Sequence, residues 1–319
     1  MNLTSTKVSV VLPYYQREAG LLAAALKSIY HQTAFARVDK IIVVDDGSPL
    51  PAILDVESIK GINGLFEKVQ VVQKTNGGVS SARNAGLDVV SDSSEYVAFL
   101  DPDDVWLPHH LECALTALDK GSNFHFANFT QLGQTQGAFE RTKQINTDEH
   151  RPIVSPNIYW FDKDMIRQIT TANVIGTSTV VYRFKETQRI RFSENFKFAG
   201  EDYVMWLSLV SLTDKISFTI DISANYGEGV NLFSGAKWGT AHLCNRLFDE
   251  INFRSFILEE FDLQKDNYEF VKAKVYENRK QYLSNAASMI KRFKVSAILL
   301  FIKHFVRGGY FRRLILNKI

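Results

Sequence analysis

Three carboxylates in four residues stand out in the stretch YVAFLDPDDVWLP. Asp101, Asp103 and Asp104 directly follow an apolar run that predicts a buried strand. Carboxylates this close raise one another's pKa and cost free energy unless something offsets their charge. A hard divalent cation such as Mg²⁺ or Mn²⁺ would do so, because it takes oxygen ligands from one or two carboxylates and from substrate phosphates. The alternative is that these aspartates only cap the next helix and are solvated.

Aromatic or acidic residues also follow two other predicted strands. The segment KVSVVLPYY ends in Tyr14 and Tyr15, and KIIVVDDGS contains Asp45 and Asp46. Ligands bind at the carboxyl ends of strands in open parallel sheets, so the three strand ends together predict a nucleotide site. Asp45 or Asp46 would accept hydrogen bonds from the base or ribose, and Tyr14 or Tyr15 would pack on the base. The alternatives are that DDGS is only a turn and that the tyrosines are ordinary rim aromatics.

The stretch NGGVSSARNAGL, from Asn76 to Leu87, joins a glycine turn to a predicted helix that carries Arg83. Exposed amides at a helix N-terminus favour an anion, and Arg83 could contact a phosphate or orient an aspartate. No Gly-Lys-Ser/Thr follows, and no GxGxxG follows the first strand. A P-loop NTPase and a dinucleotide dehydrogenase are therefore disfavoured.

Strands and helices must alternate to position these groups. The apolar runs predict strands at 7–13, 40–48, 69–72, 96–100, 124–129 and 176–183. Helices are expected at 18–31, at 80–90, from 108, from 200 or 201, and from about 236 to the end. This order predicts an α/β fold, a mostly parallel sheet flanked by helices with a helical C-terminal extension.

Composition is that of an ordinary globular protein, with 319 residues, 45% hydrophobic and 23% charged. Cys113 and Cys244 form neither a disulfide framework nor a metal-ligand spacing, which suits a reducing compartment. The beginning of the chain lacks the pattern of a signal peptide, and the apolar run AILLFI is too short to span a bilayer. We therefore expect a cytoplasmic protein.

The net charge of +2 is unevenly distributed. No acidic residue follows Glu277, and the rest of the chain carries 27 basic and 35 acidic residues, a net charge of −8. A basic end on an acidic body predicts a polyanionic partner. The ten basic residues after Glu277 are Arg279, Lys280, Lys291, Arg292, Lys294, Lys303, Arg307, Arg312, Arg313 and Lys318.

Over about residues 7–209 the chain resembles family 2 glycosyltransferases. The resemblance is carried by five motifs in this order: VVLPYY, VVDDGS, NGGVSSARNAGL, FLDPDD and GEDYVMW. The resemblance implies an inverting enzyme of the GT-A fold. It implies a catalytic domain at 1–235, with a nucleotide-sugar half at 1–105 and an acceptor half at 106–235, followed by a helical region at 236–319. The expected reaction moves a hexosyl or N-acetylhexosaminyl group from a nucleotide sugar, expected to be UDP-linked, to a hydroxyl of a lipid-linked glycan. The expected context is bacterial surface polysaccharide, such as lipopolysaccharide or capsule.

The resemblance also implies a role for individual residues. Asp103 of DPDD, in the place of a DxD motif, would be the main ligand of Mn²⁺ or Mg²⁺, although Pro102 stands where the family more often has Ser. Asp202 of GED would be the general base, with Glu201 shaping the acceptor site. The expected donor-binding residues are Pro13, Tyr15, Asp45, Asp46, Asn76, Arg83, Asp101 and Asp104.

The chemistry is consistent with these roles. A metal neutralises the charge that develops on the leaving diphosphate, and a carboxylate within hydrogen-bond reach takes the proton of the acceptor hydroxyl. The alternative for Glu201 and Asp202 is that they are simple charges at a helix N-terminus. One departure concerns residues 225–238, which lack the His or Arg that many relatives use toward the diphosphate or metal. Lys237 or Ser234 would have to substitute.

A basic amphipathic helix is predicted between Met289 and Arg307, which is typical of membrane-surface binding. One face holds Arg292, Ser296, Lys303 and Arg307, and another holds Ile290, Phe293, Ala297, Leu300, Phe301 and Phe305. We expect an anionic membrane surface as partner, on the inner face of the cell membrane, and no nucleic acid. The alternative is a helix packed on the catalytic domain with a solvated basic face.

Two other functions remain open from the residues alone. A sugar nucleotidyltransferase shares the sheet and the carboxylates but usually carries a Gly-rich basic loop after the first strand, where this chain has PYYQREAG with the single basic residue Arg17. A catalytically inactive glycan-binding module is the other alternative, and the presence of Asp103 and Asp202 argues against it.

Overall fold

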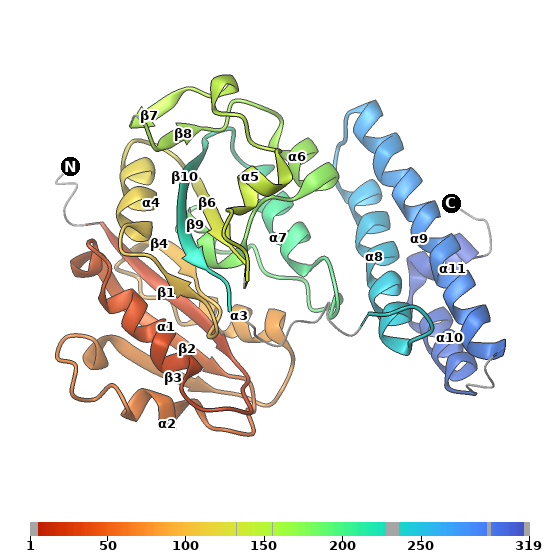
Figure 1. The fold of residues 1–319 in the computed structure, drawn as a ribbon, viewed down its shortest axis with the longest axis horizontal. Coiled ribbons are helices and arrows are strands. Elements are labelled where there is room, and N and C mark those ends of the chain that lie inside the picture. The colour runs from red at the N-terminus through yellow and green to blue at the C-terminus, as the bar shows by residue number, and fades with distance from the viewer. Residues whose placement is uncertain (1–5, 132, 155, 228–235, 292–294, 316–319) are drawn as a thin grey trace. The chain divides into compact units, whose positions relative to one another are not determined.

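The computed structural model describes residues 6–131, 133–154, 156–227, 236–291 and 295–315. The chain divides into two compact units. The sheet unit comprises the residues up to 192 together with 206–229, and the helical unit comprises 193–205 together with 230–319. The elements of both are labelled in Figure 1. The predicted domain limits stay a prediction, and the division places the segment 193–205 with the helices.

The sheet unit is built on one large sheet of ten strands within the described residues, in the order β3-β2-β1-β4-β9-β6-β10-β8-β7, with β5 paired to β10. Strands β1 to β4 pair in parallel, and so do β6 and β10. The predicted mostly parallel sheet is therefore confirmed. The strands are β1 (Lys7–Tyr14), β2 (Val38–Asp45), β3 (Val69–Gln73), β4 (Ser94–Phe99), β5 (Val105–Trp106), β6 (Phe124–Thr130), β7 (Pro152–Val154), β8 (Ile158–Trp160), β9 (Val181–Arg183) and β10 (Ile216–Asn225).

Antiparallel β9 lies between β4 and β6 and joins the two parallel parts of the sheet. The sequence predicts a longer strand here, over 176–183. The structure shortens it because Thr177–Thr179 forms a 3-10 turn, in which the Thr179 amide donates to the Gly176 carbonyl at 2.9 Å. This turn brings Ser178 against the end of β4, where it contacts the acidic loop described below.

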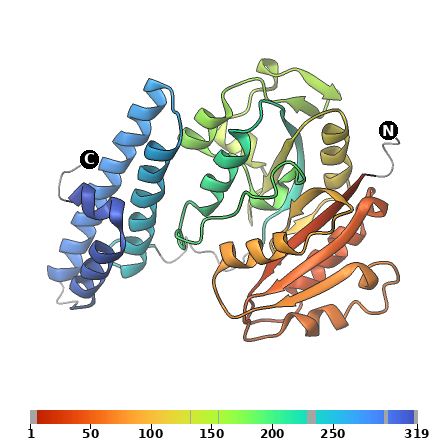
Figure 2. The same cartoon turned by 180° about the vertical axis from the view of Figure 1, so that it is seen from behind.

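Helices lie on both faces of the sheet, as the two opposite views in Figures 1 and 2 show for α1 and α3. Parallel strands covered in this way are apolar on both faces, which explains the runs in β1 and β2. The close packing of α3 on β1 requires Gly86, because a Cβ there would lie 2.5 Å from Val11 Cγ1. The helices of this part of the chain are α1 (Leu21–Tyr30), α2 (Ala52–Glu57), α3 (Val79–Asp88), α4 (His110–Asp119), α5 (Ala138–Thr142), α6 (Met165–Ala172) and α7 (Glu201–Val210), of which α7 is divided between the two units.

An aromatic cluster forms the centre of the core in the sheet unit. Trp206 is fully buried and packs against Phe99, Phe124 and Phe192, with ring centroids 6.1, 5.8 and 5.8 Å away. Phe99 also stacks on Tyr182 at 5.9 Å. Because Phe99 is the last residue of β4, this cluster fixes the strand that leads into the acidic loop.

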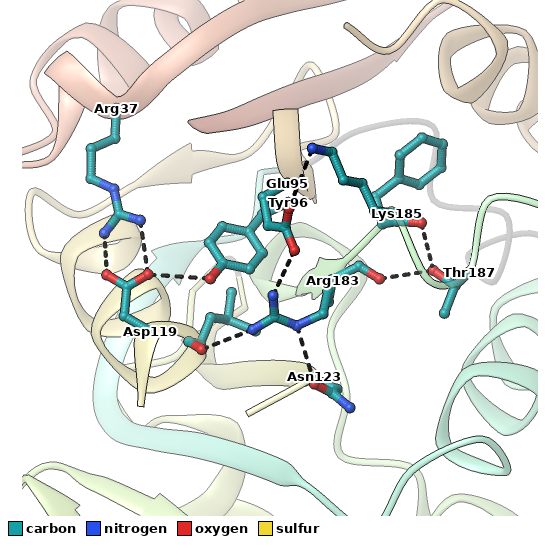
Figure 3. Close-up of polar contacts among 10 residues, drawn as sticks. Arg37, Glu95, Tyr96, Asp119, Asn123, Arg183, Lys185 and Thr187 are labelled. Carbon is teal, nitrogen blue, oxygen red and sulfur yellow. Dashed lines mark hydrogen bonds and ion pairs between the residues drawn. The ribbon is translucent and has the colours of Figure 1, made fainter. Parts of the chain in front are cut away.

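Paired charges join several elements near the amino ends of β2, β4 and β6 (Figure 3). The Arg37 guanidinium donates to both carboxylate oxygens of Asp119, at 2.7 and 3.0 Å. The Arg183 guanidinium donates to Glu95 at 2.6 Å, and its Cζ lies 5.2 Å from the centroid of the Tyr96 ring. Each cation here meets a carboxylate. We call Arg37, Glu95, Asp119 and Arg183 the paired cluster.

The helical unit contains α8 (Ala241–Glu260), α9 (Lys265–Lys291), α10 (Val295–Arg307) and α11 (Gly309–Ile315), so the predicted helical C-terminal region is confirmed for the described residues. Its core holds Cys244, Leu247, Ile251, Val275, Tyr282, Ala286, Met289 and Phe311. Both cysteines of the chain are free thiols. Among the described residues, no helix is long and apolar enough to cross a bilayer.

Candidate active site

The acidic loop follows β4, whose ladder with β1 continues through the Leu100 amide to the Val11 carbonyl at 3.1 Å. A turn then forms, in which the Asp104 amide donates to the Asp101 carbonyl at 3.1 Å. The side chain of Asp101 is 28% exposed, Asp103 is partly exposed, and Asp104 is buried. The three carboxylates therefore reach from the surface into the protein within one turn.

Ser178 holds two of these aspartates although it is 77 and 74 residues away in the sequence. Its hydroxyl accepts a hydrogen bond from the Asp101 amide at 3.0 Å and donates to Asp104 Oδ2 at 2.5 Å. The Ser178 carbonyl accepts from Trp106 Nε1 at 2.6 Å. Ser178 is fully buried, so this arrangement is part of the fold and is not a surface contact.

The chain after β10 closes over the same loop. The Gly227 amide donates to Asp104 Oδ1 at 3.0 Å, and the Tyr226 hydroxyl accepts from the Ser178 amide at 3.1 Å. A side chain at Gly227 would be excluded, because its Cβ would lie 2.0 Å from the Asp103 carbonyl oxygen. Asp104 is thus bound through both carboxylate oxygens by residues of the protein.

Like charge dominates the electrostatics of the loop. Burial, and next the charge of Asp101, raise the pKa of Asp103 to about 6. Burial, followed by the charges of Asp101 and Asp103, raises the pKa of Asp104 to about 8. A cation bound at the loop would reverse these shifts, because its charge favours the ionised carboxylates.

Arg83 is the basic residue that the structure brings to this loop. Its Nη2 lies 2.8 Å from Asp101 Oδ1, and its guanidinium lies 5.2 Å from the centroid of the Phe192 ring. Arg83 is 3% exposed, so α3 presents it from within the protein. Of the two roles that the sequence left open, the one seen here is the orientation of an aspartate.

Asp45 and Asp46, at the end of β2, bind the protein's own backbone. The carboxylate of Asp45 accepts from the Ser48 and Ala52 amides, each at 2.8 Å. The carboxylate of Asp46 accepts from the Gly77 and Gly78 amides at 2.9 and 2.7 Å, and from Lys74 Nζ at 2.6 Å. Both aspartates are buried. Their predicted contacts with a donor base stay a prediction.

The remaining predicted donor residues surround these strand ends. Pro13 and Tyr14 are buried in β1, whereas Tyr15 is 38% exposed just beyond it. Tyr15 is therefore the tyrosine that a ligand could reach. Asn76 is exposed, and its Nδ2 donates to the Asp46 carbonyl at 2.9 Å. Because β1 lies between β2 and β4, the predicted grouping of the three strand ends follows from the sheet order.

Glu201 and Asp202 occupy the first turn of α7, as predicted, and belong to the helical unit. Asp202 Oδ1 accepts from the Tyr203 amide at 2.8 Å. Gly200 precedes them with a φ of +97°, and a Cβ at that position would lie 2.1 Å from Phe253 Cδ1. The predicted roles of the two carboxylates stay predictions. Ser234, one of the proposed substitutes for a phosphate ligand, lies outside the described residues.

Ser178, Tyr226 and Gly227 were not predicted from the sequence to belong to the site. No local pattern marks them, because each reaches the acidic loop through a contact distant in sequence. The structure also bears on the metal set. In the described ranges, no group of three or more His, Cys, Asp or Glu side chains is arranged to hold a metal ion.

Residues 9–188 match the family model described as Glycosyl transferase family 2. The chain belongs to this family. As a family 2 glycosyltransferase it is an enzyme, which decides against both alternatives left open by the sequence. It is 26% identical over 303 residues to the succinoglycan biosynthesis protein ExoW of Rhizobium meliloti (strain 1021), covering 91% of this chain and 90% of that protein. It is 26% identical over 226 residues to the amylovoran biosynthesis glycosyltransferase AmsB of Erwinia amylovora, covering 68% of each.

Solved structures share the fold of this glycosyltransferase. S. aureus TarS 1–349 in complex with UDP-GlcNAc has a TM-score of 0.61 at 19% identity, covering 92% of this chain and 84% of TarS 1–349. The mannosyltransferase PcManGT from Pyrobaculum calidifontis in complex with GDP-Man and Mn²⁺ has a TM-score of 0.59 at 13% identity. The match covers 98% of this chain and 86% of PcManGT. The predicted GT-A-type fold is confirmed.

Proposed function

We propose that this glycosyltransferase moves a sugar from a nucleotide sugar to a hydroxyl of a glycan acceptor during synthesis of a bacterial surface polysaccharide. The observation that carries the proposal is the acidic loop. Three carboxylates follow one strand, and two of them have raised pKa values. Support for the context comes from relatives named for succinoglycan and amylovoran biosynthesis. A lipid-linked acceptor is part of the proposal.

A UDP-linked hexose or N-acetylhexosamine is the proposed donor. The structural likeness to a protein solved with UDP-GlcNAc supports it. In this proposal Pro13 and Tyr15 line the base, and Asp46 binds it with Asp45 beside it. Asp101 contacts the ribose and Asp104 faces the sugar, with Asn76 among the donor-binding residues. Arg83 would act by holding Asp101, since the two side chains are 2.8 Å apart.

Mn²⁺ or Mg²⁺ is the proposed cofactor, with Asp103 as its main protein ligand. The residues fit such an ion, because Asp103 is partly exposed and its carboxylate stands beside other carboxylates that repel its charge. The absence of a larger ligand cluster in the described residues also fits, since these ions take much of their coordination from substrate phosphates and water. When bound, the cation would neutralise charge that develops on the leaving diphosphate.

Asp202 is the proposed general base of the inverting displacement, and Glu201 would help to shape the acceptor site. A carboxylate in the first turn of a helix is stabilised as the anion by the helix dipole, which keeps Asp202 ready to accept a proton. The proposed location is the cytoplasm, peripheral on the inner face of the cell membrane. An anionic membrane surface is the proposed partner of the C-terminal region.

Donor-dependent thermal stabilisation tests the proposal. UDP-, GDP-, CMP- and dTDP-sugars are added with and without Mn²⁺ to the wild type, to Asp103→Ala and to the exposed control Asp214→Asn. A donor at about 100 times its Kd adds about 2.7 kcal/mol to the free energy of unfolding. We expect one nucleotide class to stabilise the wild type and the control only with Mn²⁺, and Asp103→Ala to lose the effect. Asp202→Asn keeps the donor effect and loses transfer. Stabilisation by no donor would contradict the proposal.

A further inference from the structure

Helix α10 exposes four aliphatic side chains. Ile298, Leu299, Ile302 and Val306 are 47%, 65%, 52% and 68% exposed. At 3.6 residues per turn, they fall within an arc of about 100° on the helix surface. We call these four residues the α10 aliphatic face. Single exposed aliphatics are ordinary, but four on one face of a helix mark a surface that contacts something apolar.

The other side of α10 is fixed to the helical unit, so the exposure of this face is a property of the fold. Leu300 and Phe301 pack against the core formed by α8, α9 and α11. Buried His304 contacts the Tyr282 hydroxyl through Nδ1 at 2.8 Å and Asn245 Oδ1 through Nε2 at 3.0 Å. Burial, and next the charges of Lys303 and Arg307, lower the pKa of His304 to about 4, which keeps it neutral near pH 7.

This arrangement shows which apolar side of the C-terminal helix the core of the helical unit takes. The sequence groups Leu300, Phe301 and Phe305 on one apolar face without saying what covers it. In the structure Leu300 and Phe301 pack inward, and Phe305 stacks on Phe301 at 6.2 Å. A helix that is apolar over most of its surface offers two faces, and periodicity does not say which one the core takes. Arg292, Phe293 and the side chains of Ser296 and Ala297 lie outside the described residues.

Positive charge borders the α10 aliphatic face. Lys303 and Arg307 are exposed, and their helical positions lie next to the aliphatic arc. No acidic residue follows Glu277 in the sequence, so a second copy of the same surface would meet it with like charge. Charge complementarity therefore favours an anionic partner with an apolar interior.

We propose that the α10 aliphatic face binds the surface of an anionic phospholipid bilayer. Ile298, Leu299, Ile302 and Val306 insert among the acyl chains while Lys303 and Arg307 contact lipid phosphates. With 13 residues α10 is too short to span a bilayer and suited to lie along it. Binding to the bilayer would hold the enzyme beside a lipid-linked acceptor, and only this role of the binding rests on the proposed function.

Vesicle co-sedimentation of the full chain tests the proposal. The vesicles are either pure phosphatidylcholine or contain about one third phosphatidylglycerol, and no donor is added. Leu299→Ser with Val306→Ser removes two inserting side chains at exposed positions. Leu212→Ser is the matched control, because Leu212 is 64% exposed in the sheet unit. Lys303→Gln with Arg307→Gln tests the charge.

We expect the wild type and Leu212→Ser to bind the anionic vesicles and the aliphatic double variant to bind at least about tenfold more weakly. The charge variant should bind about fivefold more weakly per charge removed. Equal binding by the aliphatic double variant would overturn the proposal, as would equal binding of the wild type to both vesicle types. A wild-type dimer that the double variant makes monomeric, without vesicle binding, would assign the face to self-association instead. Donor-dependent stabilisation of every variant is measured in parallel, so failure here is distinguishable from failure of the proposed function.

Discussion

The two ends of the parallel strands in the sheet unit differ in how carboxylates are grouped, although each end also contains ion pairs, including that of Arg83 with Asp101 at the carboxyl end. Near the amino ends, Arg37 pairs with Asp119 and Arg183 pairs with Glu95 at 2.7 and 2.6 Å. After the carboxyl end of β4, three carboxylates share one turn, and two of their pKa values are raised. Compensated charges stabilise the fold, whereas clustered like charges cost stability unless a ligand neutralises them. The difference separates the region that holds the sheet together from the region kept for a ligand.

The largest effect is expected at Asp103. Asp103→Asn keeps the shape of the side chain and removes one charged ligand of the proposed cation. Because metal stabilisation of a leaving group contributes several kcal/mol, the transfer rate should fall by about 10³-fold or more. Steady-state release of the nucleoside diphosphate measures it. A variant within a factor of about three of the wild type would contradict the role, and Asp214→Asn serves as the exposed control.

Ser178 tests whether the acidic loop must be held in one arrangement. Ser178→Ala leaves the Asp101 amide and Asp104 without their shared hydroxyl. Substitution of a residue that positions metal ligands typically weakens metal affinity by about 10–100-fold. We therefore expect the Mn²⁺ concentration for half-maximal transfer to rise by such a factor. Thr179→Ala is the control, since Thr179 is buried beside it and bonds the Gly176 carbonyl instead. An equal change in Mn²⁺ dependence in both variants would mean that the effect is only structural.

A substitution in the paired cluster should lower stability and leave the Mn²⁺ dependence of transfer unchanged. Arg37→Met removes the fork that bonds Asp119, and we expect the free energy of unfolding to fall by about 1–2 kcal/mol. The Mn²⁺ dependence of transfer should not change, because this pair lies near the amino ends of the strands. Urea unfolding and the transfer assay together check the prediction. A shift in the Mn²⁺ dependence of Arg37→Met would contradict the distinction between the amino ends of the strands, which stabilise the fold, and the carboxyl ends, which bind the ligand.

The smallest effect is a pH dependence of stability in the presence of a chelator. A carboxyl whose pKa is raised in the folded state binds more protons than in the unfolded state, so stability falls as pH rises through the raised values, about 6 for Asp103 and about 8 for Asp104. Buried His110, His125 and His304 act oppositely, and their effect fades as pH rises past their ordinary value of 6.5.

The histidine contributions are common to the wild type and Asp103→Asn, so the difference between the two proteins from pH 6.5 to about 8 isolates the carboxylates. Across this window in EDTA we expect the wild type to lose about 1 kcal/mol more than Asp103→Asn, since Asp104 in the variant faces one charge fewer. Urea unfolding at both ends of the window measures the difference. Identical slopes for the two proteins would show that the like charges of the loop carry no cost.

Local patterns predicted the parts of this molecule that depend on local physics. Apolar runs placed β1, β2 and β4, and the residues at their ends are where the sheet order groups them. The acidic loop was visible because three carboxylates after an apolar strand are unusual. Ser178 and Gly227 were invisible, because hydroxyls and glycines are common and only a distant contact gives them a role.

In the C-terminal region, too, the features that depend on contacts distant in sequence were not predicted. Its helices and their charge were predicted, but the side of α10 taken by the core was not. Tyr282 and Asn245 decide that side through His304, and neither residue is near it in sequence. The segment 193–205 likewise joins the helical unit through contacts such as the Lys197 and Phe198 amides with Asp249, which no local pattern indicates.

Direct measurement of Mn²⁺ binding tests the central claim that the acidic loop keeps its charge for a cation. The electron paramagnetic resonance signal of free Mn²⁺ is recorded as the wild type or Asp103→Asn is added, with and without UDP. We expect the wild type with UDP to remove the free-ion signal and Asp103→Asn with UDP to leave it nearly unchanged. Equal loss of the signal with both proteins would contradict the claim and would place the cation elsewhere.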